Sequence, residues 1–195
     1  PGEGKKNVLF TSRHHSSEAT ASYVLEGAVD YILSQSSEFF NKYCVYVVPM
    51  MDIDGVENGD QGKSRFPHDH NRDYVERIWN SVRAISDYFN DIDITVFTDF
   101  HNPNVNTPAY FYGYGPTWSN LAELRQILAN NTAGDIIEYS MDSKGIYGSE
   151  NSVYGNTDAN GHFYNANAGT IKISSSFECP FFVEGRDTIP NDFIE

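Results

Sequence analysis

The stretch Asn7-Val-Leu-Phe-Thr-Ser-Arg-His-His-Ser-Ser-Glu18 joins a short apolar run to a segment with helical periodicity. Residues 7–11 predict a strand, and residues 18–33 predict a helix whose apolar side chains recur every three or four positions. We expect Ser16 or Ser17 to cap the start of that helix. A strand that turns directly into a helix is the repeating unit of α/β proteins, so this stretch decides how the rest of the chain is interpreted.

The alternation of strands and helices continues along the chain. Strands are expected at residues 45–50, 94–98, 110–112 and 170–177, and helices at residues 74–89, 119–129 and part of 134–141. The strand at 45–50 is a continuous apolar run of the kind that is buried on both faces. Two long polar segments, 52–73 and 142–168, are predicted to be loops that carry function. The predicted fold is a three-layer α/β/α arrangement around a mixed, largely parallel sheet, in a single domain over residues 1–195. Such sheets bind ligands beyond the carboxyl ends of their strands.

The composition excludes several classes of function. The chain has 195 residues, 39% of them hydrophobic, and a formal net charge of -14. Because it lacks clustered Lys and Arg to neutralise phosphates, we expect no nucleic-acid partner. No apolar stretch approaches the roughly 20 residues of a membrane span. Cys44 and Cys179 are predicted to be free thiols, and the many aromatic, Asn and Ser residues favour an extracellular or periplasmic enzyme.

Two histidines and a glutamate are candidate metal ligands. His15 and Glu18 are three residues apart at the predicted strand-to-helix turn, where side chains at this spacing share one face. His101 follows a predicted strand that should lie near the first one. Catalytic zinc is commonly bound by three protein ligands of this type, with another position open. We therefore predict one Zn²⁺ ion at these three residues, with His14 as a rival ligand.

Further charged groups complete a candidate hydrolytic site. Asp69 is expected to accept a hydrogen bond from the second ring nitrogen of a ligand histidine, with an Asx-turn as the alternative. Glu178 follows the last predicted strand, and a carboxylate there can take a proton from water and pass it to a leaving amine. Arg65 and Arg72 lie in the first long loop, where a guanidinium can bind a carboxylate through two hydrogen bonds. Lys63 is a less specific candidate.

Taken in order, these fragments resemble the zinc carboxypeptidase family typified by carboxypeptidase A. The family order is His-x-x-Glu, Asp-x-Asn-Arg, a strand-end His, a loop tyrosine and a Glu on the last core strand. The matching segments here are His15-Ser-Ser-Glu18, Asp69-His-Asn-Arg72, Asp99-Phe-His101 and Ser176-Phe-Glu178. The resemblance implies a carboxypeptidase-like fold, and a catalytic domain that is either complete or lacks N-terminal elements of the family.

The resemblance also implies a role for each matched residue. The three candidate ligands would bind zinc, and Glu178 would act as general base and acid. Asn71 and Arg72 would bind the terminal carboxylate of the substrate, and Arg65 would polarise the scissile carbonyl. In this family a loop tyrosine closes over the substrate. Tyr154 fits that position best, with Tyr147 and Tyr164 as rivals.

The implied activity is zinc-dependent hydrolysis of the C-terminal amide bond of peptides that carry a free carboxylate. The same groups would also serve a zinc amidohydrolase that acts on cell-wall peptides or acyl amino acids. A catalytically inactive domain that only binds carboxylates is the alternative from another class. The preference for a substrate side chain stays open, because Asp158 is either a pocket anion or a turn residue.

Overall fold

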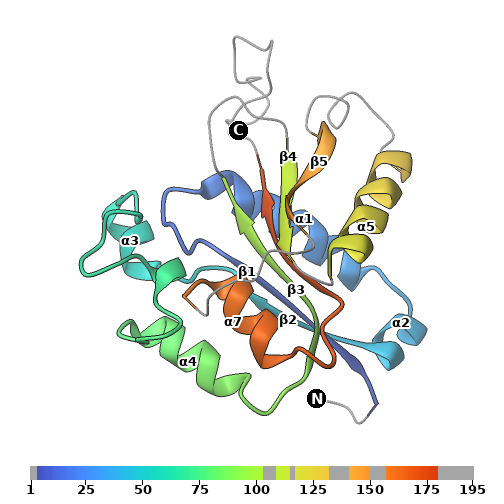
Figure 1. Ribbon diagram of the computed structural model, residues 1–195, viewed down its shortest axis with the longest axis horizontal. Coiled ribbons are helices and arrows are strands. Elements are labelled where there is room, and N and C mark those ends of the chain that lie inside the picture. The colour runs from blue at the N-terminus through green and yellow to red at the C-terminus, as the bar shows by residue number, and fades with distance from the viewer. Residues whose placement is uncertain (1–3, 103–108, 115–116, 132–140, 150–156, 180–195) are drawn as a thin grey trace.

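The computed structural model describes residues 4–102, 109–114, 117–131, 141–149 and 157–179 (Figure 1). The described strands form one six-stranded sheet in the order β2-β1-β3-β6-β4-β5. The pair β4 and β6 is antiparallel and the other neighbours are parallel, so the predicted mixed, largely parallel sheet is confirmed. The elements are β1 (Lys6–Ser12), α1 (Ala19–Leu33), α2 (Ser37–Lys42), β2 (Tyr43–Val48), α3 (Ile53–Asn58), η1 (His70–Arg72), α4 (Asn80–Tyr88), β3 (Ile94–His101), β4 (Ala109–Tyr114), α5 (Trp118–Asn131), β5 (Met141–Ser149), α7 (Ala159–Ala166) and β6 (Ile173–Glu178).

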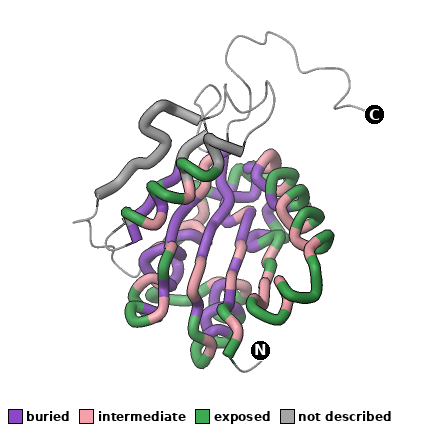
Figure 2. The backbone as a smooth tube through the Cα atoms, turned by 90° about the vertical axis from the view of Figure 1, so that its right-hand side faces the viewer, coloured by how far each residue is buried: buried purple, intermediate pink, exposed green. Residues whose placement is uncertain are grey.

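Helices cover both faces of this sheet, which gives the predicted three layers. On one face, Leu9 and Phe97 pack against α4 and α7, and the rings of Phe97 and Phe163 lie 4.6 Å apart. On the opposite face, α1 packs through Leu25 against Phe100. Figure 1 shows α4 and α7 on the other side of the strands from α1, and Figure 2 shows the central strands as the buried interior between the helices. Side chains alternate along each strand, so each core takes every second residue.

The parallel strands β1, β3 and β6 end at the same edge of the sheet. Thr11 pairs with Asp99 between β1 and β3, and His101 pairs with Glu178 between β3 and β6. Asn102, buried just beyond β3, accepts a hydrogen bond from Ala21 N and donates one to the carbonyl oxygen of residue 179. The predicted site residues that follow these strands are therefore brought to one edge, as expected for an open α/β sheet.

The first helix begins without the serine cap that the sequence predicted. Glu18 occupies the cap position and makes no side-chain capping hydrogen bond. Ser16 Oγ donates instead to Asp60 O at 2.7 Å, and Ser17 Oγ donates to Gln61 O at 3.2 Å. The two hydroxyls thus bind the loop that follows α3 and do not cap the helix.

Several predicted boundaries are wrong. The strand predicted at residues 45–50 is β2, an edge strand that is mostly half-buried rather than covered on both faces. The predicted loop 52–73 contains α3 and η1, and the helix predicted at 74–89 is confined to α4. The predicted loop 142–168 contains most of β5 and all of α7. Residues 134–140 of a further predicted helix lie outside the described part of the chain, and Met141 begins β5.

Candidate active site

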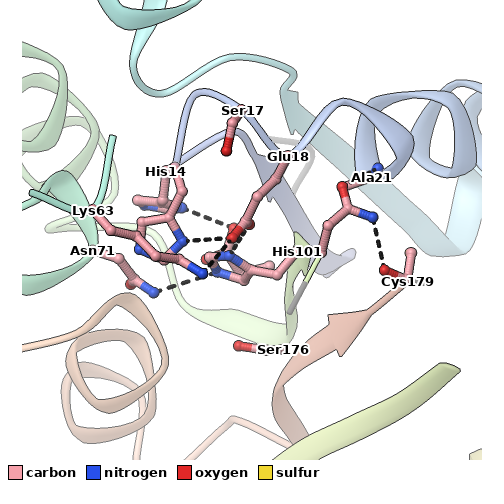
Figure 3. Close-up of polar contacts among 12 residues, drawn as sticks. His14, Ser17, Glu18, Ala21, Lys63, Asn71, His101, Ser176 and Cys179 are labelled. Atoms are coloured by element: carbon pink, nitrogen blue, oxygen red, sulfur yellow. Dashed lines mark hydrogen bonds and ion pairs between the residues drawn. The ribbon is translucent and has the colours of Figure 1, made fainter. Parts of the chain in front are cut away.

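The three predicted metal ligands converge on one point at the edge of the sheet. His15 Nδ1 lies 2.9 Å from Glu18 Oε1, and His101 Nδ1 lies 2.7 Å from Glu18 Oε2. All three side chains are buried, and each offers a ligand atom within 4.8 Å of the other two. Figure 3 shows the contacts of His101 and Lys63 meeting at the Glu18 carboxylate. The turn after β1 supplies His15 and Glu18, and the end of β3 supplies His101.

The same contacts set the charge of these groups. Burial alone would raise the pKa of Glu18, but hydrogen bonds from His101 and His15 outweigh it and hold that pKa well below its ordinary value. Burial would lower the pKa of His101, but Asp99 and then Glu18 hold it well above its ordinary value. Without a metal, these contacts favour an ionised Glu18 beside a protonated His101. Two histidines and a carboxylate are a donor set that zinc uses, and zinc binding would release the ring proton.

A carboxylate stands behind each histidine. Asp69 Oδ1 lies 3.5 Å from His15 Nε2, and Asp99 Oδ2 contacts His101 Nε2. Asp69 Oδ1 is buried and has no hydrogen-bond partner among the described residues. A carboxylate on Nε2 keeps the ring proton there and leaves Nδ1 free for a metal. This arrangement, with both Nδ1 atoms turned toward Glu18, fits a zinc ion bound by His15, Glu18 and His101.

His14 belongs to a second group of potential ligands, with Asp99 and His101. Its Nδ1 lies 2.8 Å from Asp99 Oδ1, and its Nε2 lies 2.8 Å from the hydroxyl of Tyr74. His14 and Asp99 are both 0% exposed. A catalytic metal needs an open coordination position, whereas both imidazole nitrogens of His14 already have partners. The geometry favours His15 over His14 as the ligand.

The loop between β2 and η1 packs directly on the His-x-x-Glu segment. Gly62 has a φ of +94°, and a Cβ there would lie 2.6 Å from Ser16 N, so only glycine allows this approach. The close approach brings Lys63 Nζ to 3.0 Å from Glu18 Oε1. The Lys63 side chain is 41% exposed, so this side of the site opens to solvent.

Asn71 and Arg72 come from η1, beside the candidate ligands. Asn71 is buried, its Oδ1 accepts a hydrogen bond from Ala159 N at 3.1 Å, and its Nδ2 lies 3.3 Å from His101 Nε2. Arg72 is exposed and donates to Asn71 O at 3.0 Å. Within the described ranges, no carboxylate lies at ion-pair distance from Arg72. Its guanidinium is therefore available to an anion that approaches from solvent.

Arg65 is held more firmly than Arg72. Its Nε donates to Asp52 Oδ2 at 2.8 Å, and its Nη2 donates to Asp52 Oδ1 at 3.0 Å and to Asp60 Oδ2 at 3.2 Å. Asp52 also accepts from Gly55 N at the start of α3. The guanidinium is thus fixed by two carboxylates, and among the described residues Nη1 has no hydrogen-bond partner.

Glu178 lies at the end of β6, opposite His101. Ser174 and Ser176 of the same strand both contact Asn160 of α7, at 2.9 and 2.7 Å. Because side chains two residues apart share a face of a strand, Glu178 lies on this same face of the sheet. Burial raises the pKa of Glu178 above its ordinary value, and His101 only partly offsets that effect. A half-buried carboxyl with a raised pKa is suited to exchanging a proton.

Two further sequence predictions meet the structure differently. Asp158 caps α7, and its side chain accepts a hydrogen bond from Gly161 N, so it is the turn residue of the two alternatives. Tyr154 lies outside the described residues. Tyr147 lies in β5, and Tyr164 is a half-buried residue of α7 that packs against the larger core.

Sequence reasoning missed Asp99 and underrated Lys63. Asp99 lies two residues before His101 on β3, and alternation along a strand places both on one face. That spacing was a usable signal. The contact between Lys63 and Glu18 depends on the path of a loop, which residue spacing does not reveal.

Comparisons with known proteins find the same family that the sequence resembles. The model of the zinc carboxypeptidase family matches residues 1–82, a segment that contains His15, Glu18, Asn71 and Arg72 and ends before His101. Cytosolic carboxypeptidase 2 of Xenopus tropicalis is 27% identical over 135 residues, which cover 64% of this chain and 14% of that protein. Cytosolic carboxypeptidase 6 of Caenorhabditis elegans is 26% identical over 121 residues, which cover 56% of this chain and 26% of that protein.

Solved structures share the fold. A metallo-carboxypeptidase from Pseudomonas aeruginosa superposes with a TM-score of 0.72 at 16% identity, over 93% of this chain and 50% of that chain. A metallo-carboxypeptidase from Burkholderia cenocepacia gives a TM-score of 0.67 at 17% identity, over 92% of this chain and 49% of that chain. The resemblance to the zinc carboxypeptidase family and its fold is therefore confirmed. The chain spans about half the length of these structures and a smaller share of the curated relatives.

The expectation of an extracellular or periplasmic, secreted enzyme is wrong. The curated relatives reported above are named cytosolic carboxypeptidases, and these names contradict the expectation. A composition rich in aromatic, Asn and Ser residues reflects polar loops and does not identify a compartment. Across the described residues, no helix is long and apolar enough to cross a membrane.

Proposed function

We propose that this chain carries the active site of a zinc-dependent carboxypeptidase, which hydrolyses the C-terminal amide bond of peptides. The main support is the convergence of His15 Nδ1 and His101 Nδ1 on the two oxygens of Glu18, with Asp69 and Asp99 behind the rings. A bound zinc ion would supply Lewis-acid polarisation of a carbonyl and activation of water.

Glu178 is the proposed general base and acid. It takes a proton from the attacking water and later gives it to the amine of the leaving amino acid. Its register opposite His101 and its raised pKa support this assignment, because a catalytic carboxyl works best when its pKa lies nearer to the operating pH.

Asn71 and Arg72 are proposed to bind the terminal carboxylate of the substrate. Arg72 supports this because its exposed guanidinium has no ion-pair partner among the described residues, while a fork of N–H donors matches a carboxylate. Arg65 is proposed to donate to the scissile carbonyl through Nη1, since Asp52 and Asp60 fix the rest of its guanidinium. Tyr154 stays the proposed tyrosine that covers the substrate.

We also propose that the enzyme acts inside the cell. The names of the curated relatives support this location. Cys44 and Cys179 are both free in the structure, which suits a compartment where thiols stay reduced.

The decisive experiment compares Glu178→Gln with the wild type in the full-length protein loaded with zinc. The substrate is a peptide with a free C-terminal carboxylate, and the same peptide with an amidated end is the control. We expect the variant to keep its zinc and to lose at least about 100-fold in turnover, the lower range for a general base. Full activity in the variant would remove Glu178 from the mechanism.

The choice of substrate distinguishes the carboxypeptidase from the amidohydrolase and from the inactive binding domain. Cleavage of the free peptide but not of the amidated one supports the carboxypeptidase. Cleavage only of acyl amino acids or cell-wall peptides indicates the amidohydrolase. A wild-type protein that binds the free peptide and zinc but cleaves no substrate is the inactive carboxylate-binding domain.

A further inference from the structure

We propose that a buried network of four residues positions His101 as a metal ligand. The network consists of Thr11, His14, Tyr74 and Asp99, and we call it the Asp99 network. The inference rests on the proposed function, because it concerns the metal that this function requires. These are positioning residues, since they act on the metal only through His101.

The network is continuous from Tyr74 to His101. The Tyr74 hydroxyl lies 2.8 Å from His14 Nε2, and His14 Nδ1 lies 2.8 Å from Asp99 Oδ1. Thr11 Oγ1 donates to the same oxygen at 2.7 Å. The second carboxylate oxygen, Oδ2, contacts His101 Nε2. Every contact joins segments far apart in the sequence except the last, which is fixed by the two-residue repeat of β3.

The donors and acceptors of the network match when Asp99 is ionised and both rings are neutral, with Asn71 Nδ2, 3.3 Å from His101 Nε2, making no hydrogen bond to that nitrogen. An ionised Asp99 accepts from Thr11 and from His14 Nδ1 at one oxygen, and from His101 Nε2 at the other. His14 Nε2 is then the acceptor for the Tyr74 hydroxyl. With its proton held on Nε2, His101 presents a free lone pair at Nδ1, the atom that faces Glu18. The network thus selects the tautomer that a metal requires.

Burial makes the network effective. Thr11, His14 and Asp99 are 0% exposed and Tyr74 is 2% exposed. When a buried carboxylate loses a hydrogen-bond donor, the cost of its desolvation is no longer offset by that bond. Asp99 would therefore shift toward any remaining partner. His101 is one of these partners. A shift of Asp99 would therefore rotate the His101 ring and turn the Nδ1 lone pair away from the metal position. His14 is therefore more than a satisfied core histidine.

The test measures zinc affinity of the full-length protein by competition with a chromophoric chelator. Thr11→Val removes one donor to Asp99, and His14→Leu removes another. We expect affinity losses of about 10-fold to 100-fold, the usual range when a group that holds a ligand is lost. The matched control is Ser12→Ala, which deletes an equally buried hydroxyl of the same strand that donates to Pro49 O at 2.7 Å. The control should keep wild-type zinc affinity.

A conservative variant separates positioning from a general packing role. In His14→Asn, the side-chain nitrogen stands one bond from Cγ, as Nδ1 does in histidine, so it can still donate to Asp99. We expect His14→Asn to recover most of the zinc affinity lost in His14→Leu. In the cobalt-substituted protein, the visible absorption bands should shift in His14→Leu and stay unchanged in Ser12→Ala, since only the former alters the orientation of His101.

The outcomes are distinct. Unchanged zinc affinity in both Thr11→Val and His14→Leu would overturn the inference while leaving the proposed function intact. An equal loss in Ser12→Ala would also overturn it, because the effect would then belong to the strand as a whole. A wild-type protein that takes up no zinc would overturn the proposed function itself. If His14→Leu does not fold, Thr11→Val against Ser12→Ala decides the question.

Discussion

His101 and His15 face the same carboxylate, but different parts of the molecule hold them. His101 ends β3, which has β1 on one side and β6 on the other, and Asp99 directly contacts its Nε2. His15 lies in the turn after β1, and Asp69, 3.5 Å from its Nε2, comes from the long loop before η1. One ligand is oriented by the sheet, and the other depends on a loop.

This difference links the metal to the substrate. The loop that places Asp69 behind His15 also leads into Asn71 and Arg72, the proposed carboxylate-binding residues. The strand that carries His101 leads into no proposed substrate-binding residue, and its one contact with them is Asn71 Nδ2, 3.3 Å from His101 Nε2. We therefore expect changes on the His101 side to alter chiefly metal binding, and changes on the His15 side to alter metal binding and substrate binding together.

The largest expected effect on zinc binding comes from removing the carboxylate that both histidines contact. Glu18→Gln should abolish stoichiometric zinc binding, because an amide is a far poorer zinc ligand than an anionic carboxylate. Glu38→Gln is the control, since Glu38 pairs with Lys42 on the surface of α2. Metal analysis of the purified full-length proteins measures the outcome. A full complement of zinc in Glu18→Gln would contradict the proposed ligand set.

The second prediction compares the two outer carboxylates directly. Asp99→Asn should reduce zinc affinity by about 10-fold to 100-fold, whereas Asp69→Asn should reduce it by less than about 10-fold. The reason is that Asp99 contacts His101 closely, while Asp69 stands 3.5 Å from His15. Chelator competition gives both values. An equal or reversed order would mean that the loop fixes its histidine as firmly as the strand does.

The smallest expected effect comes from the loop itself. Gly62→Ala places a Cβ 2.6 Å from Ser16 N, so the loop must move away from the His-x-x-Glu segment and weaken zinc binding by a few-fold. Gly59 also has a positive φ, of +72°, but a Cβ there meets nothing within 4 Å.

Gly59→Ala is therefore the matched control for backbone strain. Each variant should lose about 1–2 kcal/mol of unfolding free energy from the left-handed backbone alone. Denaturant unfolding and zinc affinity are measured on both. If Gly59→Ala weakens zinc as much as Gly62→Ala does, loop contact with the ligand turn is not the cause.

The sequence predicted the parts of the site that depend on local spacing and strand order. His15, Glu18 and His101 meet because two parallel strands end at the same edge, and periodicity is enough to find those strands. The Asp99 network was missed, because its contacts need the adjacency of β1 and β3 and the path of the loop to Tyr74. Contacts between residues 60 to 88 positions apart leave no mark on local periodicity.

The missed helices have a different cause. Asp52 and Asp158 each cap a short helix by accepting a backbone hydrogen bond from a glycine three residues later. Both residues lie in Gly-rich and Asn-rich segments that favour loops by composition. A capping aspartate is a sequence signal for a helix start, but helices of six and eight residues have too few turns for apolar periodicity to confirm it.

The pairing of His101 with Glu178 also limits which changes β6 can tolerate. A single inserted or deleted residue within β6 would exchange the two faces of the strand. Phe177 would then meet the polar edge, and the proposed base would turn into the apolar layer under α1. Ser174 and Ser176 add contacts with Asn160 of α7 that hold the strand in this register. The length of this short strand is therefore a requirement for the proposed function in its own right, apart from its composition.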